Sequence, residues 1–465
     1  MRGSQRNIAR LTAMVTQRTG SLQLGTKGVA SVTEHEFEVR TMRRVSRRLL
    51  PLLFVLYIFN FLDRTNVGIA ALQMNDELKF SSTAFGLGSG IFFLGYALFE
   101  VPSNLILVRV GARRWLARIM ITWGLLACGT LAVRTPAQFY TVRFLLGVAE
   151  AGFFPGIIYY MAQWFPANYR ARAIAGFMIA APLSRVLGGP LGGALLGLNG
   201  VGHLSGWQWL FLIEGLPSVL LGVLVLVGLT ERPAEADWLS TEQRHWLTSR
   251  LDAEQPRMTV SERSPLRALA LPLVWLLTIP YFATNVAVFA YNFWEPTLLR
   301  EMLGTSYLST GLISGAIALL AAGAFISAGT ISDRRDERCG LAALGLMFAC
   351  VGFVGLALPH SPLQVIALVV IALSGPTIAA PFWCLPTKLL KGPAAASGIA
   401  LINAIGSCGG FVGPTVVGFF RQTAIGDTGA FLGIAALALV GSLVCVALRQ
   451  LTLLGPTPQR ISARS

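Results

Sequence analysis

The chain has 465 residues, of which 54% are hydrophobic and only 13% are charged, and its formal net charge is +15. A soluble fold of this length would need far more polar surface. Together with a mean hydropathy of +0.63, this composition excludes an ordinary soluble protein and predicts an all-α membrane protein.

The first 42 residues precede any apolar run. They contain Arg, Thr and Ser but no continuous apolar core followed by a small-residue cleavage site, which argues against a cleaved signal peptide. We predict a cytoplasmic N-terminal tail over residues 1–42. Two interpretations of it stay open: a disordered segment, or an extension upstream of a start at Met42.

Twelve apolar runs are long enough to span a hydrocarbon core, which takes about 20 residues. They lie near residues 49–72, 84–108, 115–133, 138–163, 172–198, 207–229, 271–296, 308–332, 340–359, 362–385, 394–420 and 428–449. The one long polar segment, 230–270, separates two sets of six and carries a predicted surface helix from Ser240 to Leu251, with Ser240 as its cap. We therefore predict twelve transmembrane helices in two six-helix bundles, 43–229 and 271–449, and a tail over 450–465.

Basic residues gather at alternate ends of these runs. One set of ends carries Arg43, Arg44, Arg47, Arg48, Arg109, Arg113, Arg114, Arg118, Arg170, Arg172, Arg334, Arg335, Arg338, Lys388 and Lys391. The other set carries only Lys79, Arg134, Arg300 and Arg421. By the positive-inside rule, both termini and the linker are cytoplasmic in a multi-pass protein of the inner (cytoplasmic) membrane. The net positive charge is therefore explained by the orientation of the chain in a lipid bilayer. No nucleic-acid partner is expected.

Four charged residues lie within apolar runs of the first bundle: the adjacent Asp63 and Arg64, and then Arg143 and Glu150. A central Asp or Arg costs roughly 2.5–3.5 kcal/mol on insertion scales, so a membrane helix keeps one only beside a partner or a water-filled cavity. These four residues predict a polar pathway through the bundle.

The two halves share a run of small residues at corresponding positions. The fifth helix contains Gly188-Gly189-Pro190-Leu191-Gly192-Gly193, and the eleventh contains Gly409-Gly410-Phe411-Val412-Gly413-Pro414. Small residues four apart let membrane helices approach closely, so tight packing is the favoured role and substrate contact the alternative. Matching runs indicate an internal duplication, which is typical of transporters with a site at the repeat interface.

The loops after the second and eighth helices also correspond. The later loop contains Gly329, Asp333, Arg334 and Arg338, and the earlier one keeps Arg109, Gly111 and Arg113. This pattern resembles the loop motif G-x-L-S-D-R-x-G-R-R of the major facilitator superfamily, which implies the major facilitator fold and a cytoplasmic gate at the later loop. Because the earlier loop has Val108 where Asp is usual, a carboxylate-based relay that latches the first half there is not expected.

Finer motifs lie in residues 57–68, 143–156 and 403–414. In combination they resemble the anion:cation symporter family of phthalate, tartrate, hexuronate and galactonate permeases, and the resemblance spans about residues 43–449. It implies secondary active transport by alternating access, with proton-coupled uptake of a small organic anion such as a sugar acid, a dicarboxylate or an aromatic carboxylate. An anion exchanger without net proton coupling is the alternative.

The buried charges suit that chemistry. Arg143 and Glu150 are two helical turns apart on one face, so they can line a single cavity. Arg keeps its charge and offers a planar fork for a carboxylate, which makes Arg64 and Arg143 candidate substrate-binding residues. A carboxyl group can lose its charge in a partly dehydrated cavity, which makes Asp63 and Glu150 candidate proton-coupling residues. We hypothesise that a proton arriving at Glu150 releases Arg143 for the anion.

Two alternatives to this hypothesis stay open: a static ion pair between Arg143 and Glu150, and a place for Asp63 and Arg64 near a helix end. Two further candidates are Tyr96, at a position that the resemblance implies is near substrate, and Asn403, which we expect to hydrogen-bond substrate. Aromatic packing and helix–helix contact are their alternatives. For the weaker candidates, packing is at least as good an explanation; these are Tyr291, Asn292, Trp294 and Trp383.

Arg185 lies near the middle of the fifth helix, where a cation is costly. One interpretation is that it binds a second acidic group of the substrate. The others are pairing with Glu150 or another carboxylate, or a place at the lipid boundary. Because the interiors of helices eight to twelve carry no carboxylate, we expect the electrostatics to be concentrated in the first half.

No sequence pattern indicates catalysis. The chain has no G-x-S-x-G, H-E-x-x-H or Walker motif, and its four His fall in predicted loops or tails, so neither enzyme activity nor a cofactor is expected. The six Cys occur singly, without the spacing of a metal site or a disulfide framework.

Overall fold

The computed structural model describes residues 2–254, 271–335, 337–358, 363–390 and 394–454. Within these ranges the chain is helical and contains no β-strand. Twelve spans in the described ranges are long and apolar enough to cross a membrane. The predicted all-α class and the predicted number of spans are therefore confirmed.

The first six spans form one bundle, and several of them are built from two helices. Its helices are α1 (Arg2–Leu78), α2 (Ser82–Val110), α3 (Ala112–Gly129), α4 (Pro136–Glu150), α5 (Phe153–Ala162), α6 (Ala167–Met178), α7 (Ala180–Leu196) and α8 (Gly206–Gly228). The apolar part of α1 belongs to a span from His35 to Leu78. Of the predicted N-terminal tail, residues 2–42 belong to α1.

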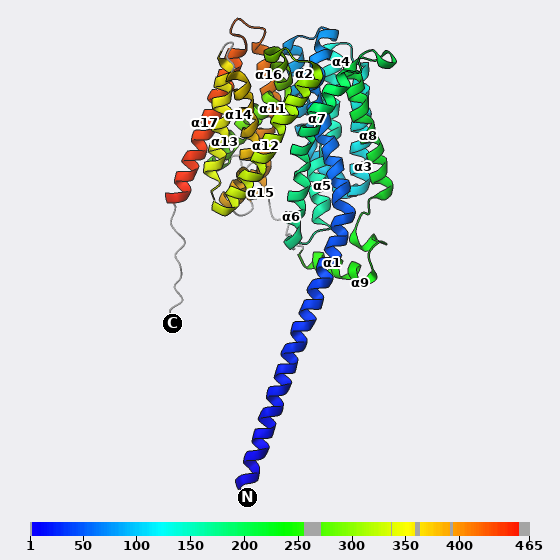
Figure 1. Ribbon diagram of the computed structural model, residues 1–465, viewed down its shortest axis with the longest axis vertical. Coiled ribbons are helices and arrows are strands. Elements are labelled where there is room, and N and C mark those ends of the chain that lie inside the picture. Colours follow the sequence, from blue (N-terminus) through cyan, green and yellow to red (C-terminus); the bar gives the residue numbers. More distant parts are fainter. Residues whose placement is uncertain (1, 255–270, 336, 359–362, 391–393, 455–465) are drawn as a thin grey trace.

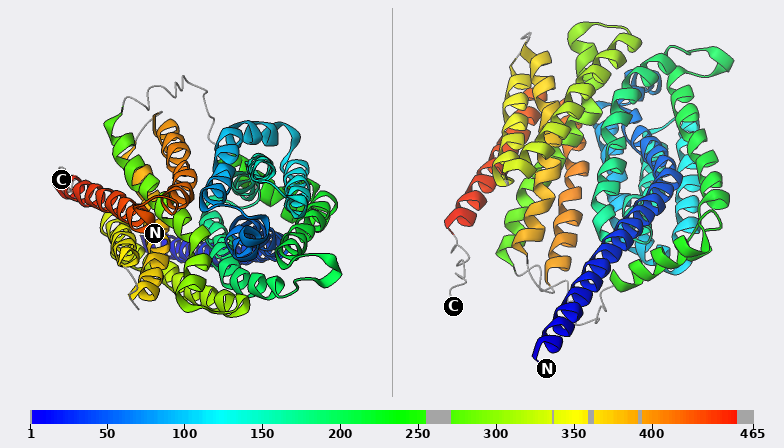
Figure 2. Two further views of the ribbon diagram at one scale, coloured as in Figure 1. Left: turned by 90° about the horizontal axis from the view of Figure 1, so that it is seen from above. Right: turned by 60° about the horizontal axis from the view of Figure 1, so that its bottom comes forward.

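The last six spans form the second bundle, which lies beside the first (Figures 1 and 2). Its helices are α11 (Pro272–Leu303), α12 (Tyr307–Arg335), α13 (Cys339–Ala357), α14 (Leu363–Leu389), α15 (Ala394–Ser407), α16 (Gly409–Phe420) and α17 (Gly426–Leu454). Between the bundles run the short helix η3 (Pro233–Glu235) and α9 (Thr241–Glu254). The rest of the predicted linker, residues 255–270, lies outside the described residues.

One end of the molecule carries both α9 and the projecting N-terminal part of α1 (Figure 1). We call this end the α9 face and the other end the opposite face. Because successive spans reverse direction, α2 and α12 begin at the opposite face and end at the α9 face. The ends predicted to be basic, including the connections from α2 to α3 and from α12 to α13, thus share the α9 face.

Three of the predicted continuous helices are broken. The fourth span divides between α4 and α5, the fifth between α6 and α7, and the eleventh between α15 and α16. The first break has a local cause, since Gly152 has a φ of +85°, which L side chains rarely adopt. The break matters for function because it places Glu150 at the very end of α4.

The two halves meet most closely where α7 packs on α12 and α2 packs on α16. A Cβ atom at Gly189 would lie 2.5 Å from the carbonyl oxygen of Gly311, and one at Gly86 would lie 2.5 Å from that of Pro414. Backbones approach this closely only where side chains are absent. The predicted packing role of the glycine run 188–193 is thus confirmed at Gly189. Both contacts lie in the half of the molecule nearer the opposite face.

The predicted surface helix of the linker is also present as α9. The Ser240 hydroxyl accepts from the backbone N–H of Gln243 at 3.2 Å, and the Gln243 side chain accepts from the backbone N–H of Ser240 at 3.2 Å. This reciprocal pair is a capping box. It confirms Ser240 as the cap and fixes where α9 begins on the α9 face.

The first-half loop obtains a carboxylate from a distant position. Glu231, just after α8, accepts from the backbone N–H of Ala112 at 2.6 Å and of Arg113 at 3.0 Å. A carboxylate at a helix N-terminus is favoured by the free N–H groups and by the helix dipole. The expectation that no carboxylate-based relay latches the first half at this loop stays a prediction, since no acid stands at Val108 and Glu231 binds only backbone N–H groups there.

Replacing Gly111 tests this contact. Gly111 has φ +98° and ψ 150°, and a Cβ there would lie 2.9 Å from Oε1 of Glu231. We expect Gly111→Ala to lower the free energy of unfolding by about 1–3 kcal/mol, because the backbone is strained and the Glu231 contact is displaced. Thermal unfolding of the purified protein in detergent measures this. Gly129→Ala is the matched control, since φ is −61° there and nothing lies within 4 Å. Equal melting temperatures for the two variants would contradict the prediction.

Candidate functional site

Asp63 and Arg64 lie well inside the membrane-spanning part of α1, so the alternative that places them near a helix end is wrong. Successive side chains on a helix point in different directions, and adjacent residues therefore do not face each other. Asp63 faces α8, where the Ser218 hydroxyl donates to its Oδ2 at 3.2 Å. Arg64 faces α2 and α4 instead.

Arg64 forms an ion pair with Glu150 of α4. The Glu150 side chain is 2% exposed and that of Arg64 is 15% exposed, so the pair is buried while the guanidinium stays reachable. Three aromatic rings surround the guanidinium, with centroid distances of 5.2 Å to Tyr96, 5.5 Å to Phe92 and 5.6 Å to Phe61. Cation–π contacts and the ion pair together orient the Arg64 fork.

The break after α4 fixes the position of Glu150. The carbonyl oxygen of Ala151 leaves the helix and accepts from the Ser103 hydroxyl at 2.6 Å. Trp115 in turn donates its ring N–H to the Ser103 oxygen at 2.9 Å. A Cβ atom at Gly152 would collide with the Ser103 side chain. A buried hydrogen-bond chain thus holds the end of α4 and, with it, the carboxylate that meets Arg64.

Arg143 is 1% exposed, and its guanidinium lies 4.9 Å from the centroid of the Phe92 ring. Its Nε and Nη2 have no hydrogen-bond partner among the described residues. It lines a small cavity together with Asp63 and Glu150, which confirms that Arg143 and Glu150 can share one cavity. A buried guanidinium with donors that the described residues leave unused could accept an anion, and substrate binding by Arg143 stays a prediction.

The partner assigned to Glu150 needs correction. The sequence hypothesis pairs Glu150 with Arg143 on the same helix, whereas the structure pairs it with Arg64 of α1. Side chains on a helix lean toward its N-terminus, so Arg143, two turns before Glu150, leans away from it. A static ion pair between Arg143 and Glu150 is absent for the same reason.

Tyr96 and Asn403 approach this group from the two halves. Tyr96 on α2 lies against Arg64, as given above. Asn403 on α15 donates to Oε2 of Glu100 on α2 at 3.5 Å, and its Oδ1 accepts from the Tyr281 hydroxyl at 3.4 Å. Asn403 therefore links α2 in the first half with α11 and α15 in the second. Its role in substrate binding stays a prediction.

Arg185 on α7 lies neither against Glu150 nor at the lipid boundary. Its guanidinium is 5.4 Å from the ring centroid of Tyr291 on α11, and Glu295 of α11 lines the same small cavity as Arg185. Glu295 in turn accepts from the Ser314 hydroxyl on α12 at 2.8 Å. Among the described residues, no ion pair joins Arg185 to a carboxylate, and binding of a second acidic group of the substrate stays a prediction.

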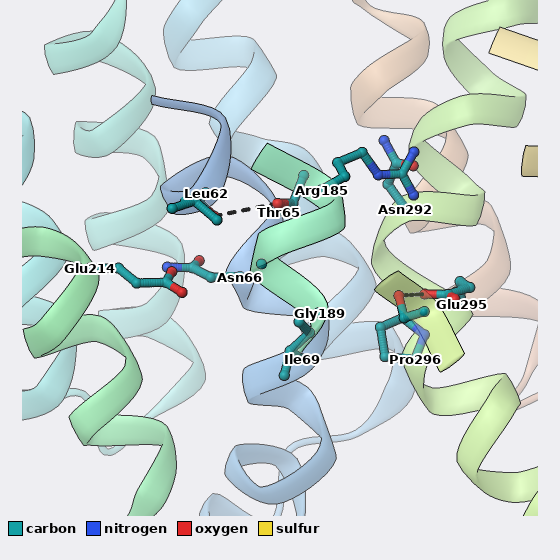
Figure 3. Close-up of a pocket in the computed structure, with 12 residues that line it drawn as sticks. Leu62, Thr65, Asn66, Ile69, Arg185, Gly189, Glu214, Asn292, Glu295 and Pro296 are labelled. Atoms are coloured by element: carbon teal, nitrogen blue, oxygen red, sulfur yellow. Dashed lines mark hydrogen bonds between the residues drawn. The ribbon is translucent and has the colours of Figure 1, made fainter. Parts of the chain in front are cut away.

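The weaker candidates divide between two environments. Asn292 and Tyr291 lie beside Arg185 at the seam between the halves (Figure 3). Trp294 is 2% exposed and donates its ring N–H to the Pro414 carbonyl oxygen at 3.2 Å, which is a packing role between α11 and α16. The Trp383 ring lies 4.9 Å from that of Tyr281, edge-on.

The predicted gate residues lie where α12 ends at the α9 face. Gly329, Asp333 and Arg334 belong to the last turns of α12, and Arg338 directly precedes α13. The neighbouring Glu337 accepts from Arg449 of α17 at 2.9 Å. Their action as a gate stays a prediction.

Sequence analysis missed three acids of this region. Glu214 on α8 is 1% exposed, Glu295 on α11 is 2% exposed, and Glu100 contacts Asn403. Each is a lone acid in an apolar run, so the cost argument that singles out Asp63 and Glu150 could have found them. Asp63, Arg143, Glu150 and Glu214 are buried in the first half and Glu295 in the second, so the charge is concentrated in the first half as expected, with one buried acid outside it. Among the described residues, no group of three His, Cys, Asp or Glu could hold a metal ion.

The chain is similar to known membrane transporters. A sequence profile described as Major Facilitator Superfamily matches residues 53–414. The chain is 46% identical over 420 residues to a putative tartrate transporter of Agrobacterium vitis, covering 89% of this chain and 95% of that protein. It is 39% identical over 389 residues to a quinolone resistance transporter of Acinetobacter baumannii, covering 83% and 90% of the two proteins.

A solved structure gives the same fold. It is a bacterial homologue of the human lysosomal transporter Spinster in an inward-facing, occupied conformation. The TM-score is 0.70 at 17% identity, and the match covers 86% of this chain and 96% of that one. At this identity the likeness concerns the fold alone.

Proposed function

The chain belongs to the Major Facilitator Superfamily, and from this membership we propose that it imports a small organic anion together with protons across the cytoplasmic membrane. Transport proceeds by alternating access, in which the two six-helix halves rock around a site between them. The fold and its relatives are those of transporters rather than enzymes.

The observation that carries this proposal is the buried ion pair of Arg64 and Glu150. While Glu150 is ionised, it neutralises Arg64 and competes with any anion for the guanidinium. A proton on Glu150 removes that competition, so the fork of Arg64 can bind a substrate carboxylate instead. Because each binding event favours the other, proton and anion cross the membrane together.

The substrate class follows from the groups around this pair. The Arg64 guanidinium, with Arg143 behind it, supplies the cationic charge that an acid needs. From the second half, Asn403 and the Tyr281 hydroxyl supply hydrogen-bonding groups suited to the hydroxyls of a hydroxy acid. The name of the relative from Agrobacterium vitis supports a tartrate-like dicarboxylate. Sugar acids and aromatic carboxylates also carry a carboxylate group that Arg64 could bind.

We propose that the α9 face is cytoplasmic, with both termini on that side. The predicted basic ends fall on this face, as the positive-inside rule requires. The glycine contacts of α7 with α12 and of α2 with α16 close the opposite face. Toward the α9 face the two bundles diverge (Figure 1), and this arrangement supports an inward-facing state.

Uptake into proteoliposomes tests the proposal. The purified full-length chain is reconstituted, and the uptake of tartrate, galactonate, phthalate, hydroxyphenylacetate and a quinolone is measured with and without an imposed pH gradient. With one proton per anion, each pH unit of external acidity supports an accumulation of about tenfold. We expect at least one organic acid to accumulate in this way and to be released by a protonophore.

Protein-free liposomes are the control. Counterflow without acid-stimulated uptake would identify the second candidate, an anion exchanger without net proton coupling. Accumulation of the quinolone alone would contradict the proposed substrate class.

A further inference from the structure

A narrow polar slot lies at the seam between the halves. It is lined by α1, α7 and α8 on one side and by α11 and α12 on the other. Its volume is about 30 Å³, which has room for one or two water molecules. Glu214 and Asn66 lie toward one side of the slot and Glu295 toward the other (Figure 3). The slot therefore connects the seam with the interior of the first bundle.

Four side-chain oxygens along the slot have no hydrogen-bond partner among the described residues. They are Oδ1 of Asn66, Oε2 of Glu214, Oδ1 of Asn292 and Oε1 of Glu295. None of these four side chains is more than 8% exposed. Buried polar atoms are normally satisfied by protein or by water. A row of unsatisfied oxygens along a water-sized slot thus marks a path for water and protons.

The slot continues toward the Arg143 cavity through α1. Asn66 lines both the slot and the small cavity that holds Asp63, Arg143 and Glu150. Asp63 and Asn66 are three residues apart and share one face of α1. They face α8, where Ser218 donates to Asp63 and Glu214 lies beside Asn66 (Figure 3). A polar route thus runs from the seam past Glu214 to Asp63.

The charges around Glu214 leave it without a cation. Asp63 of α1 accepts from Ser218, one helical turn after Glu214 on α8, and Arg185 of α7 lines the same slot but points toward Asn292 (Figure 3). In the described part of the chain, neither Glu214 nor Asp63 forms an ion pair. Glu214 precedes Ser218 by four residues on α8, so it shares the helix face from which Ser218 donates to Asp63.

A charge count then requires a proton. Asp63 and Glu214 are two buried acids, and Arg143 is the cation of the adjoining cavity. Glu150 lines that cavity too, but its charge is balanced by Arg64. The group therefore becomes neutral when the two acids hold one proton between them. Two neighbouring buried carboxylates would otherwise repel each other in a medium that solvates neither.

We propose that Glu214 is a second proton site of this transporter, loaded through the slot from the seam, and that it passes its proton to Asp63. This proposal rests on the proposed proton coupling. In the transfer, the proton leaves Oε2 of Glu214, which becomes a carboxylate, and binds Oδ1 of Asp63 directly or through one water. Glu295 receives protons at the seam, where its Oε1 lies on the same slot.

The test separates the movement of protons from the movement of substrate. Glu214→Gln keeps the shape of the side chain but cannot release a proton. In proteoliposomes, we expect counterflow of radiolabelled tartrate at equal pH to stay within about twofold of the original protein. Accumulation driven by a pH gradient is expected to fall by at least about tenfold, as when a proton-transfer group is removed. Infrared spectroscopy is expected to show the loss of one protonated carboxyl band.

Two further variants show whether the effect of Glu214→Gln comes from the lost proton site or from altered packing. Glu235→Gln removes an exposed acid of η3 and is expected to change neither activity. Glu214→Asp keeps a carboxyl group and is expected to restore accumulation. Undiminished accumulation by Glu214→Gln would overturn the proposal. If Glu214→Gln and Glu214→Asp lost counterflow and accumulation equally, Glu214 would have a packing role, and the proposal would also be overturned. If the original protein accumulates no acid at all, the proposed function fails, while the infrared band still decides whether Glu214 holds a proton.

Discussion

Arg64→Lys is expected to weaken binding and transport of the organic acid by about 30- to 100-fold, equivalent to roughly 2–3 kcal/mol at 1.4 kcal/mol per tenfold. Lysine keeps the positive charge but loses the planar fork, which binds a carboxylate through two parallel hydrogen bonds. It also loses the stacking of a flat guanidinium among Tyr96, Phe92 and Phe61. Counterflow at several substrate concentrations measures the loss.

Arg118→Lys is the matched control for this change. The Arg118 guanidinium also lies over an aromatic ring, 4.5 Å from the centroid of Trp115. Arg118 belongs to α3, however, and does not contact Arg64 or Glu150. We expect its transport to stay within about twofold of the original protein, as is usual for a substitution away from a functional group. If Arg64→Lys bound the acid as tightly as Arg118→Lys does, Arg64 would not be the anion anchor.

Glu150→Gln is expected to uncouple the transporter. Glutamine cannot take up a proton or neutralise Arg64, so the guanidinium is free for the anion at every pH. Under the proposed coupling, protonation of Glu150 raises the affinity of the original protein for the acid. In the variant, the affinity no longer depends on this proton. We expect counterflow to persist while accumulation under a pH gradient falls from about tenfold per pH unit to equilibrium.

Glu301→Gln serves as the control for removing an acid from an ion pair. Glu301 pairs with Arg421 at 2.6 Å, but its side chain is 51% exposed, and exposed pairs contribute only about 0–1 kcal/mol. We expect this variant to accumulate substrate normally. Accumulation by Glu150→Gln against a gradient driven only by protons would show that the ion pair with Arg64 does not couple proton and anion.

The two uncoupling variants are distinguishable from each other. Glu150 touches the anchor for the substrate, so its loss changes how substrate affinity depends on pH. Glu214 lies behind Asp63 and touches no anchor, so Glu214→Gln is expected to slow proton delivery while the pH dependence of affinity persists. Measuring both quantities in both variants separates binding of the coupled proton from its delivery.

The transmembrane helices and the burial of charged residues within them were predictable from the sequence because both depend on local properties. Apolar runs of span length predict transmembrane helices, and a charge inside such a run is costly wherever the helix packs. The capping of α9 by Ser240 was predictable for the same reason, since it involves residues three apart. The breaks were harder, because a Gly in a membrane helix is common and only the backbone angle at Gly152 distinguishes a break from a close contact.

Partners were less accessible to sequence reasoning. Glu150 has Arg143 two turns away on its own helix, and that spacing suggested an ion pair. The actual partner, Arg64, is 86 residues distant and reaches Glu150 from α1. Glu231 binds backbone N–H groups of the first-half loop from a position 119 residues beyond Ala112. Such pairs form because helices distant in the chain pack side by side, and nothing in either local pattern records which helices do so.

The sequence by itself determined that this protein is a twelve-span membrane carrier with charge buried in its first half, because hydrophobic length and the cost of a buried charge are properties of each segment alone. Tertiary structure decided the surroundings of each charge: Arg64 pairs with Glu150, Arg185 and Glu295 line one slot across the seam, and Asp63 meets Ser218 on the α8 face that also carries Glu214. The physical reason is that electrostatic interactions depend on distance in space, and packing of the two halves sets that distance.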